Sequence, residues 1–380
     1  MAVVDEAFWA GRRVLITGHT GFKGAWLALW LEALGASVWG LADGVPTEPS
    51  LHALARVGEG IDEVRADVRD LDAVRRAMVA ARPSVVLHLA AQPLVRRSYE
   101  APAETFAVNV QGTAHVLEAV RSVGGVEAVV VVTSDKCYAP GEAVGGSAGE
   151  STAEVESSAR AGAGHRESDP LGGRDPYSAS KAAAELVTAA YRASYGLPLA
   201  TARAGNVIGG GDWGADRLLP DVMAAALGGA PVELRAPDAV RPWQHVLNPL
   251  AGYLLLAERI AEGDAEAASA WNFGPAPEEA IPVRALVERL GELWGSSLAV
   301  TAQPGDHPHE TATLRLDSTR ARERLGWSPA WDLDDGLRAI VDWYRAYAAG
   351  ADPRDTTLSQ IAAYQRAARR PESARGAAPA

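Results

Sequence analysis

Polar residues that could carry acid–base chemistry follow directly on an apolar run near the middle of the chain. Four consecutive valines, residues 129–132, are followed by Thr133, Ser134, Asp135 and Lys136. A hydroxyl, a carboxyl and an amine in successive positions can polarise an oxygen, donate a proton and accept one. The same residue types are ordinary in a turn that ends a strand. Taken alone, the segment therefore leaves an active site and a polar turn as equal alternatives.

A second candidate pair lies further along the chain. Tyr177 and Lys181 are four residues apart in a segment with a helical pattern, so both side chains share one helix face. A cation one turn away favours the phenolate and should lower a tyrosine pKa from about 10 toward working pH. We therefore expect Tyr177 to act as a general base. The lone cysteine, Cys137, is either a nucleophile or, more commonly for this residue type, a small buried packing residue.

A glycine-rich loop near the N-terminus predicts a dinucleotide site. Gly18, Gly21 and Gly24 stand between a short apolar strand at 13–17 and a helical run at 25–34. Without a Cβ, such glycines let the backbone turn tightly, approach a pyrophosphate and pack helix against strand. The alternative is an empty structural turn. We expect the cofactor to contact the loop, later strand ends and neighbouring helices, namely Gly18, Thr20, Gly21, Phe22, Gly24, Asp43, Asp67, Val68, Leu89, Ala90, Ala91, Asn109, Thr133, Tyr177 and Lys181.

Asp43 bears on which dinucleotide is bound. It follows Gly24 by 19 residues, where an acid commonly binds the adenosine ribose and disfavours a 2′-phosphate. This spacing favours NAD over NADP. Residues 43–46 also read as a plain turn.

The elements that must position these residues alternate between strand and helix. Strands are expected at 13–17, 37–41, 84–91, 129–132 and 199–204, with helices at 25–34, 72–81, 104–122 and from 177 onward. Such alternation predicts an α/β fold, a Rossmann-like doubly wound parallel sheet. Because the carboxyl ends of parallel strands share one edge, the polar residues above should meet there.

The domain expectations follow from changes in composition along the chain. We expect an NAD-binding domain at 8–204 and a smaller mixed α/β substrate domain, mainly at 205–347, with the chain crossing between them. Residues 139–166 are rich in Gly, Ala, Ser and Glu and are expected to form a mobile loop, either a lid or disordered. The last residues, 369–380, resemble a frayed tail.

Composition excludes several classes of partner. The 36 basic and 48 acidic residues give a net charge of −12, which argues against a nucleic-acid surface. No apolar run approaches the ~18 residues of a membrane span, and the first ten residues lack a basic signal region. One cysteine fits a reducing compartment. We therefore expect a cytoplasmic protein without nucleic-acid or membrane partners, and no metal site.

Together, the glycine loop and the Tyr-x-x-x-Lys pair resemble the extended short-chain dehydrogenase/reductase family. Within it, several blocks look like the CDP-glucose 4,6-dehydratases, over a resemblance that runs from about Phe8 to Tyr347. These blocks are the segments 18–24, 88–96, 133–138, 204–213 and 241–246.

The resemblance implies an NAD-dependent lyase that converts CDP-glucose to CDP-4-keto-6-deoxyglucose, a step of deoxysugar biosynthesis. Tyr177, assisted by Lys181, would remove the proton of the sugar 4-hydroxyl while NAD takes the C4 hydride, and Ser134 would polarise the 4-oxygen. Asp135 would protonate the departing 6-hydroxyl. Lys136 would remove the C5 proton, which requires a neutral amine, or it would stabilise an enolate. The family also implies a homodimer or homotetramer.

Four further residues are expected to bind the nucleotide sugar. Arg241 and Arg217 could pair with the diphosphate, because guanidinium groups bind phosphate oxygens in two-pronged fashion. For each arginine the alternative is an ordinary surface charge. Asn206, after the strand at 199–204, could bond sugar or phosphate, and Gln92 is expected beside the substrate.

Two other functional classes stay open at this point. One is another nucleotide-sugar 4,6-dehydratase or a 4-epimerase of the same fold. Asp135 and Lys136 argue against an epimerase, because epimerisation needs no elimination at C6. The other is a non-catalytic NAD-binding regulator, which the intact Ser134, Tyr177 and Lys181 disfavour.

Overall fold

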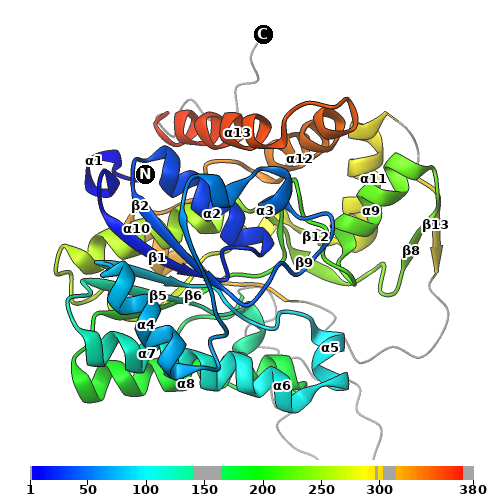
Figure 1. Ribbon diagram of the computed structural model, residues 1–380. Helices are drawn as coiled ribbons and strands as arrows, with labels where there is room; N and C mark the ends of the chain where they lie inside the picture. Colours follow the sequence, from blue (N-terminus) through cyan, green and yellow to red (C-terminus); the bar gives the residue numbers. More distant parts are fainter. Residues whose placement is uncertain (1, 140–163, 296–297, 303–313, 371–380) are drawn as a thin grey trace, which may run out of the picture.

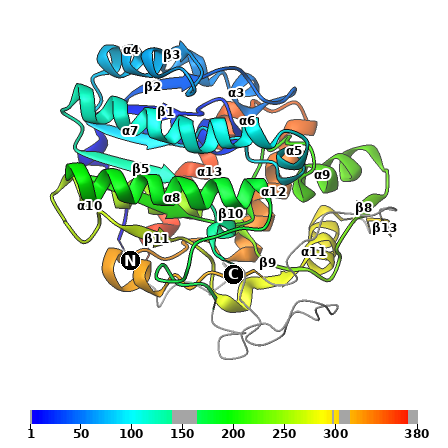
Figure 2. The same cartoon turned by 90° about the horizontal axis from the view of Figure 1, so that it is seen from below.

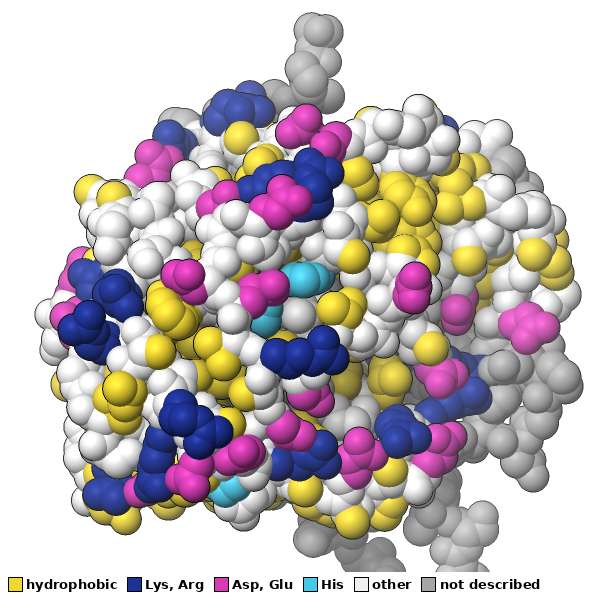
Figure 3. Space-filling view, viewed as in Figure 1, with side chains coloured by type: hydrophobic (Ala, Val, Ile, Leu, Met, Phe, Trp, Pro, Cys, Tyr) yellow, Lys and Arg dark blue, Asp and Glu magenta, His cyan; other side chains and the backbone are white. Residues whose placement is uncertain are grey.

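The chain is described by a computed structural model that covers residues 2–139, 164–295, 298–302 and 314–370. Most of the expected mobile loop at 139–166 and the last ten residues of the expected tail at 369–380 lie outside the described residues. Acidic and basic side chains are interspersed over the face in Figure 3.

A seven-stranded sheet forms the centre of the molecule (Figure 1), in the order β11-β6-β5-β4-β1-β2-β3. Every neighbouring pair in it is parallel. Strands β4, β5 and β6 are buried along their whole length, as expected for apolar strands covered on both faces. The predicted Rossmann-like parallel sheet is confirmed. The strands are β1 (Arg13–Thr17), β2 (Ser37–Ala42), β3 (Asp62–Arg65), β4 (Val85–His88), β5 (Ala128–Val132), β6 (Leu199–Arg203) and β11 (Ala270–Asn272).

The strand order reverses between β1 and β4, the two central neighbours. From β1 the chain builds outward through β2 and β3, and from β4 it builds through β5 and β6 in the other direction. Loops at the carboxyl ends diverge on the two sides of such a switch point, which opens a crevice for ligands. The fold therefore places the candidate residues around one crevice.

Helices cover both faces of the sheet (Figures 1 and 2). Two apolar clusters fill the space between helices and sheet, one on each face. On one face lie α2 (Phe22–Ala33), α10 (Leu247–Ala261), α12 (Leu333–Ala348) and α13 (Pro353–Ala368). On the other lie α4 (Leu71–Ala81), α7 (Gly112–Val123) and α8 (Pro176–Tyr195).

The helix expected at 104–122 has a more complex form. It begins as α6 (Pro102–Phe106), continues as a π-helical turn, η2 (Ala107–Gln111), and ends as α7. A π-turn widens the helix and re-aims the side chains it carries, and such turns are frequent near functional sites. Asn109 lies in this turn.

The second part of the chain does not form a separate layer. Strand β11 completes the edge of the central sheet, and α10 packs against β5. Smaller strand pairs join β7 (Val207–Ile208) to β10 (Gln244–His245), β9 (Val240–Pro242) to β12 (Ala280–Pro282) and β8 (Val232–Leu234) to β13 (Val300–Ala302). The remaining elements are α1 (Glu6–Trp9), α3 (Leu51–Leu54), η1 (Val57–Glu59), α5 (Val95–Glu100), η3 (Asp135–Cys137), α9 (Leu218–Gly228), η4 (Pro277–Glu279), α11 (Val283–Trp294) and η5 (Ala321–Leu325).

Helix α13 was not expected from the sequence. Its buried Ile361 and Tyr364 face the core, and the ring of Tyr364 meets that of Trp30 edge-on, with centroids 5.6 Å apart. The last helix is therefore part of the core built around α2. No helix among the described residues is long and apolar enough to cross a membrane.

Candidate active site

A large cavity of about 1930 Å³ opens at the carboxyl edge of the sheet. Ligand pockets commonly measure about 300–1,000 Å³, so this volume suits two ligands side by side. All the expected catalytic residues and substrate contacts line it, together with every expected cofactor contact except Asn109. The fold thus brings together residues that are up to about 220 positions apart in the sequence.

The glycine loop has the geometry that a pyrophosphate requires. Gly18 adopts a φ of +77°, and a Cβ there would lie 2.7 Å from the amide nitrogen of Ala90. A Cβ on Gly24 would lie 2.1 Å from the Gly18 carbonyl oxygen, so only glycine lets α2 start this close to β1. No side chain caps the N-terminus of α2, which leaves its first amides available to an anion. These residues fit a dinucleotide cofactor.

Two acids flank the cofactor end of the cavity. Asp43 lies exposed just after β2, the position that a ribose contact requires. Asp67 instead pairs with Arg69, whose hydrogen bonds lower the pKa of this carboxyl. The Asp67 carboxylate is therefore already engaged by a neighbouring side chain.

The structure places Asn109 behind the cavity wall, and its expected contact with the cofactor stays a prediction. Asn109 is 2% exposed and does not line the cavity. Its amide accepts from the Gln92 backbone nitrogen at 2.8 Å and donates to the Gln92 carbonyl and to Ser180 Oγ. Because both ends of the amide are used, Asn109 acts from behind the wall and ties the loop after β4 to helix α8.

Gln92 lies at the cavity, but its side chain is committed to its own loop. Its amide nitrogen donates to the Leu94 carbonyl and to Thr105 Oγ1, and its oxygen accepts from the Leu94 amide at 2.6 Å. Gln92 thus lies on the wall of the cavity, and its expected place beside the substrate stays a prediction.

The polar residues after β5 form a short 3₁₀ turn that points into the cavity. Ser134 Oγ donates to Asp135 Oδ1 at 3.1 Å and accepts from the Lys136 amide at 3.2 Å. Asp135 is 2% exposed, and its Oδ2 has no hydrogen-bond partner among the described residues. A Cβ on Gly205 would come within 1.7 Å of that oxygen, so this glycine makes room for the carboxyl.

Burial is the largest influence on the pKa of Asp135. It raises the pKa of the carboxyl above its ordinary value, against the opposing charges of Lys136, Arg241 and Lys23 and the hydrogen bond from Ser134. A raised pKa favours the protonated form, which is the form that a general acid needs. The geometry therefore favours an acid at Asp135.

Helix α8 places Tyr177 and Lys181 on the face toward β5. The Lys181 ammonium donates to the Val132 carbonyl at 3.1 Å, and burial lowers its pKa to about 8. The expectation that Tyr177 has a lowered pKa is wrong in this structure. Burial raises it to about 12, although hydrogen bonding with Ser134 acts in the opposite direction. Desolvation of a phenolate outweighs a cation that is already bonded elsewhere.

Lys23 is a residue to which the sequence interpretation assigned no role. It stands between Gly21 and Gly24, in the first turn of α2, and lines the same cavity as Asp135. The residue is half-buried as a whole, but its amine is desolvated, and burial together with Arg217 and Lys181 lowers its pKa to about 7. A lysine between the second and third glycines of the motif was the feature of the sequence that could have indicated a role for Lys23.

The two expected diphosphate arginines differ in their surroundings. Arg217 pairs with the buried Asp212 at 3.0 Å and donates to the Val207 carbonyl, so part of its guanidinium is committed. Arg241 is 6% exposed at the cavity wall and close enough to Asp135 to influence its pKa. Asn206, also on the wall, has a φ of +42°, a left-handed conformation that asparagine tolerates better than most residues.

Cys137 is a packing residue. Its thiol is fully buried in a small cluster with Tyr138, Ala182 and Leu316. Burial raises the pKa of the thiol, so the thiolate form that a nucleophile requires is disfavoured.

Several known proteins are similar to this chain in sequence or fold over most of its length. The sequence profile of the GDP-mannose 4,6-dehydratase family matches residues 15–340. A CDP-glucose 4,6-dehydratase of Salmonella typhimurium is 43% identical over 97% of this chain and all of that protein. A dTDP-glucose 4,6-dehydratase of Streptomyces venezuelae, solved with NAD bound, has a TM-score of 0.72 and 26% identity over 90% of this chain and 99% of its own. The UDP-glucose 4-epimerase of Thermus thermophilus, in complex with NAD, has a TM-score of 0.70 and 30% identity over 88% of this chain and 99% of its own. This chain therefore belongs to the GDP-mannose 4,6-dehydratase family.

Proposed function

We propose that this protein is an NAD-dependent CDP-glucose 4,6-dehydratase, a hydro-lyase that forms CDP-4-keto-6-deoxyglucose. The assignment of the substrate rests on the 43% identity to a CDP-glucose 4,6-dehydratase over 97% of the chain. The observation that favours elimination over simple redox chemistry is the buried Asp135, whose pKa is raised in the same cavity as Tyr177 and Lys181.

Bound NAD supplies the hydride acceptor for oxidation at C4 and the hydride donor at C6, so the reaction has no net redox change. The glycine loop would hold its pyrophosphate, and Asp43 its adenosine ribose. Tyr177 would accept the proton of the sugar 4-hydroxyl. To accept this proton Tyr177 must be the phenolate, and Lys181 and Ser134 would stabilise that form, since a cation and a hydrogen-bond donor both lower the cost of its charge.

Elimination then requires an acid and a base. Oxidation at C4 acidifies the hydrogen on C5, because the carbanion is conjugated with the new carbonyl. Asp135 would protonate the departing 6-hydroxyl, which leaves as water. A raised pKa suits this step, because the group must hold its proton until the C–O bond breaks.

Two lysines can take the C5 proton. Lys136 is next to Asp135 in sequence, and it is the residue expected in this role from the resemblance to the CDP-glucose enzymes. Lys23 is the one whose surroundings favour a neutral amine, with a pKa of about 7. Because a lysine is a base only when neutral, we favour Lys23 and treat Lys136 as the second candidate.

The nucleotide end of the substrate would lie on the side of the cavity formed by the second part of the chain. Arg241 would bind the diphosphate, because it lies on the wall near Asp135. Arg217 would contribute only the part of its guanidinium not used by Asp212. Asn206 would bond to the sugar or phosphate from the same wall.

One assay distinguishes this function from its alternatives. Purified protein is incubated with NAD and, in separate reactions, CDP-, dTDP- or UDP-glucose, and products are followed by NMR. We expect a 4-keto-6-deoxy sugar from CDP-glucose. Turnover of dTDP- or UDP-glucose alone would reject the cytidine assignment, UDP-galactose would indicate a 4-epimerase, and no turnover would leave a binding protein.

We further propose that the enzyme works in the cytoplasm as a homodimer or homotetramer. The single buried Cys137 fits a reducing compartment. Helix α8 exposes Leu186 and Tyr195 by 60% and 54%, apolar surface that a second subunit could cover. Light scattering on the purified protein would reveal a monomer if the oligomer proposal is wrong.

A further inference from the structure

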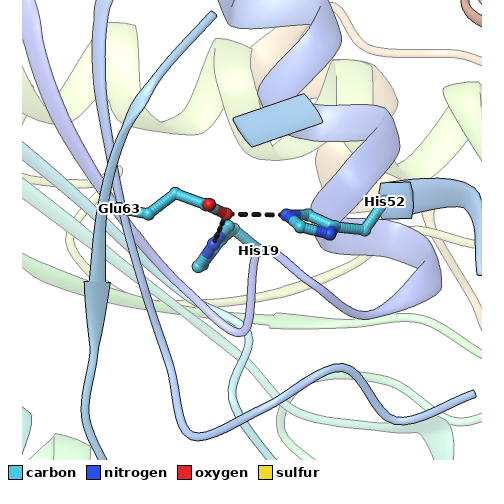
Figure 4. A group of neighbouring side chains, drawn as sticks. All are labelled: His19, His52 and Glu63. Carbon is cyan, nitrogen blue, oxygen red and sulfur yellow. Dashed lines mark hydrogen bonds and ion pairs between the residues drawn. The ribbon is translucent and has the colours of Figure 1, made fainter. Parts of the chain in front are cut away.

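Three side chains from separate elements meet behind the glycine loop (Figure 4). His19 belongs to the loop between β1 and α2, His52 to α3 and Glu63 to β3. The Nε2 atoms of the two imidazoles lie 2.7 and 2.6 Å from the same oxygen, Glu63 Oε1. The three potential ligand atoms are all within 4.8 Å of one another.

The fold makes specific room for this cluster. A Cβ on Gly40 of β2 would come within 2.4 Å of the His19 ring, and one on Gly58 would come within 2.4 Å of Glu63 Oε2. The rings of His19 and His52 stand at 73° to each other, with centroids 5.5 Å apart. The two nitrogens therefore converge from different directions on one point beside the carboxylate.

The exposed fraction of the three side chains increases from the interior of the protein toward its surface. The side chains of His19, His52 and Glu63 are 2%, 14% and 38% exposed. The two imidazoles are thus held in place by the protein, while the carboxylate can adjust and solvent can reach its outer side. This is the arrangement of a site that an ion can enter and that keeps one position for water.

We propose that His19, His52 and Glu63 bind a divalent transition-metal ion, with Zn²⁺ as the best fit and water as the fourth ligand. Two imidazoles and one carboxylate are a ligand set that zinc accepts in tetrahedral sites, whereas Ca²⁺ and Mg²⁺ prefer oxygen ligands throughout. In such a site neighbouring ligand atoms are about 3.3 Å apart. Each N···O distance must then widen by about 0.6 Å, which the exposed Glu63 side chain can provide.

If hydrogen bonds between neutral side chains alone held this cluster, one buried nitrogen atom of His19 would lack a hydrogen-bond partner among the described residues. If both imidazoles donate from Nε2 to Glu63, the buried Nδ1 of His19 must be an acceptor, and no partner meets it among the described residues. With a metal ion on Nε2, Nδ1 carries the hydrogen and can donate toward the Leu41 carbonyl beside the ring. A backbone carbonyl that fixes the tautomer in this way is typical of metal-bound histidines.

The site would be structural rather than catalytic. None of the three residues lines the active-site cavity, but His19 lies between Gly18 and Thr20, which do. A bound ion would fasten the glycine loop to α3 and β3 from behind. The inference does not depend on the proposed dehydratase activity.

The test is metal binding by the full-length protein after treatment with a chelator. Zn²⁺ is titrated by calorimetry, and Co²⁺ by its visible absorption, which is intense only in tetrahedral or five-coordinate sites. We expect one saturable ion per chain. His52→Gln and Glu63→Gln should each weaken Zn²⁺ binding about a hundredfold or more.

Matched controls separate this site from adventitious binding. His115→Gln and Glu59→Gln remove the same residue types outside the cluster and should leave the affinity unchanged. Circular dichroism verifies that each variant is folded. Absence of a saturable ion, a Co²⁺ spectrum typical of octahedral hydration, or equal affinity in His52→Gln would overturn the proposal and leave a hydrogen-bonded cluster.

Discussion

Among single residues, Asp135 is the clearest link between structure and reaction type. An oxidation at C4 alone would need only Tyr177, Lys181 and a hydroxyl. A carboxyl buried to 2% exposure, with one oxygen unpartnered within the described residues, is costly to ionise, and this favours the protonated form that a proton donor requires. Its chemistry can therefore be tested apart from the redox step.

Replacement of this carboxyl should separate oxidation from elimination. We expect Asp135→Asn to lower formation of the 4-keto-6-deoxy product by about 10²–10⁴-fold, because an amide cannot donate an acidic proton. Oxidation at C4 should continue, visible as NADH absorbance in stopped flow. Asp72→Asn, at an exposed position of α4, is the control. Normal product formation would remove Asp135 from the role of acid.

The pH dependence of the reaction tests Lys23 as the C5 base. Because the pKa of Lys23 is about 7, the amine becomes neutral as pH rises through that value. We expect kcat/KM to rise with pH around pH 7 and Lys23→Met to lose this rise together with exchange of the C5 hydrogen with solvent. If Lys136→Met removes the rise while Lys23→Met keeps it, Lys136 is the base.

Among the elements, helix α8 carries both the catalytic pair and its anchor to the sheet. Glu185, one turn after Lys181, is 3% exposed and accepts from Arg203 Nε and Nη2 at 2.9 and 2.8 Å. The hydroxyls of Thr133 and Thr201 donate to the same carboxylate. This network ties α8 to β5 and β6 and so fixes the distance from Tyr177 to Ser134.

Loss of this buried ion pair should destabilise the protein strongly. We expect Glu185→Gln to lower the free energy of unfolding by about 3–5 kcal/mol, because the Arg203 charge stays buried without its partner. Urea titration at neutral pH measures the change. Glu127→Gln, whose pair with Arg12 is half-exposed, should cost at most about 1 kcal/mol. Equal losses in the two variants would contradict the role given to burial.

At the scale of the whole molecule, contacts between distant parts of the chain hold α13 and α1 against the other helices. Helix α13 covers α2, and the N-terminal α1 is attached to α10 through Glu258. Glu258 Oε1 accepts from the Trp9 indole at 2.6 Å and from the Asp5 amide at 3.0 Å. Burial raises the pKa of this carboxyl from 4.5 to about 7.

This contact predicts how stability depends on pH. A raised pKa means that the folded protein favours the neutral carboxyl, so the stabilisation is complete below pH 4.5 and is lost as pH rises through about 7. Glu258→Gln keeps the acceptor without the charge. We expect it to be more stable than the wild type by up to about 3 kcal/mol at pH 8 and nearly equal at pH 4.5.

Thermal or urea unfolding of both proteins at the two pH values measures the difference. Glu233→Gln, an exposed position of β8, is the control, and its difference from the wild type should not depend on pH. A constant difference between wild type and Glu258→Gln would show that folding does not shift the pKa of this carboxyl.

The sequence by itself determined the parallel sheet, the glycine loop and the Tyr177–Lys181 pair. Each depends on residues close together in the chain, where a glycine, a valine run or a four-residue spacing constrains the backbone directly. The same patterns predicted that the polar residues would meet at the carboxyl edge of the sheet. The residues predicted from these local signals line one cavity, with the exception of Asn109.

Only the tertiary structure decided which side chains are buried, which are already bonded and which distant residues meet. The Asn109 amide is bonded to the backbone of Gln92, and the Gln92 amide to Leu94 and Thr105. Lys181 is bonded to a carbonyl of β5, and Lys23 acquires its low pKa from burial and from Arg217 and Lys181, which are far along the chain. The convergence of His19, His52 and Glu63 also follows no spacing in the sequence. Desolvation and hydrogen bonding depend on the three-dimensional surroundings of an atom, and those arise only when separate elements pack.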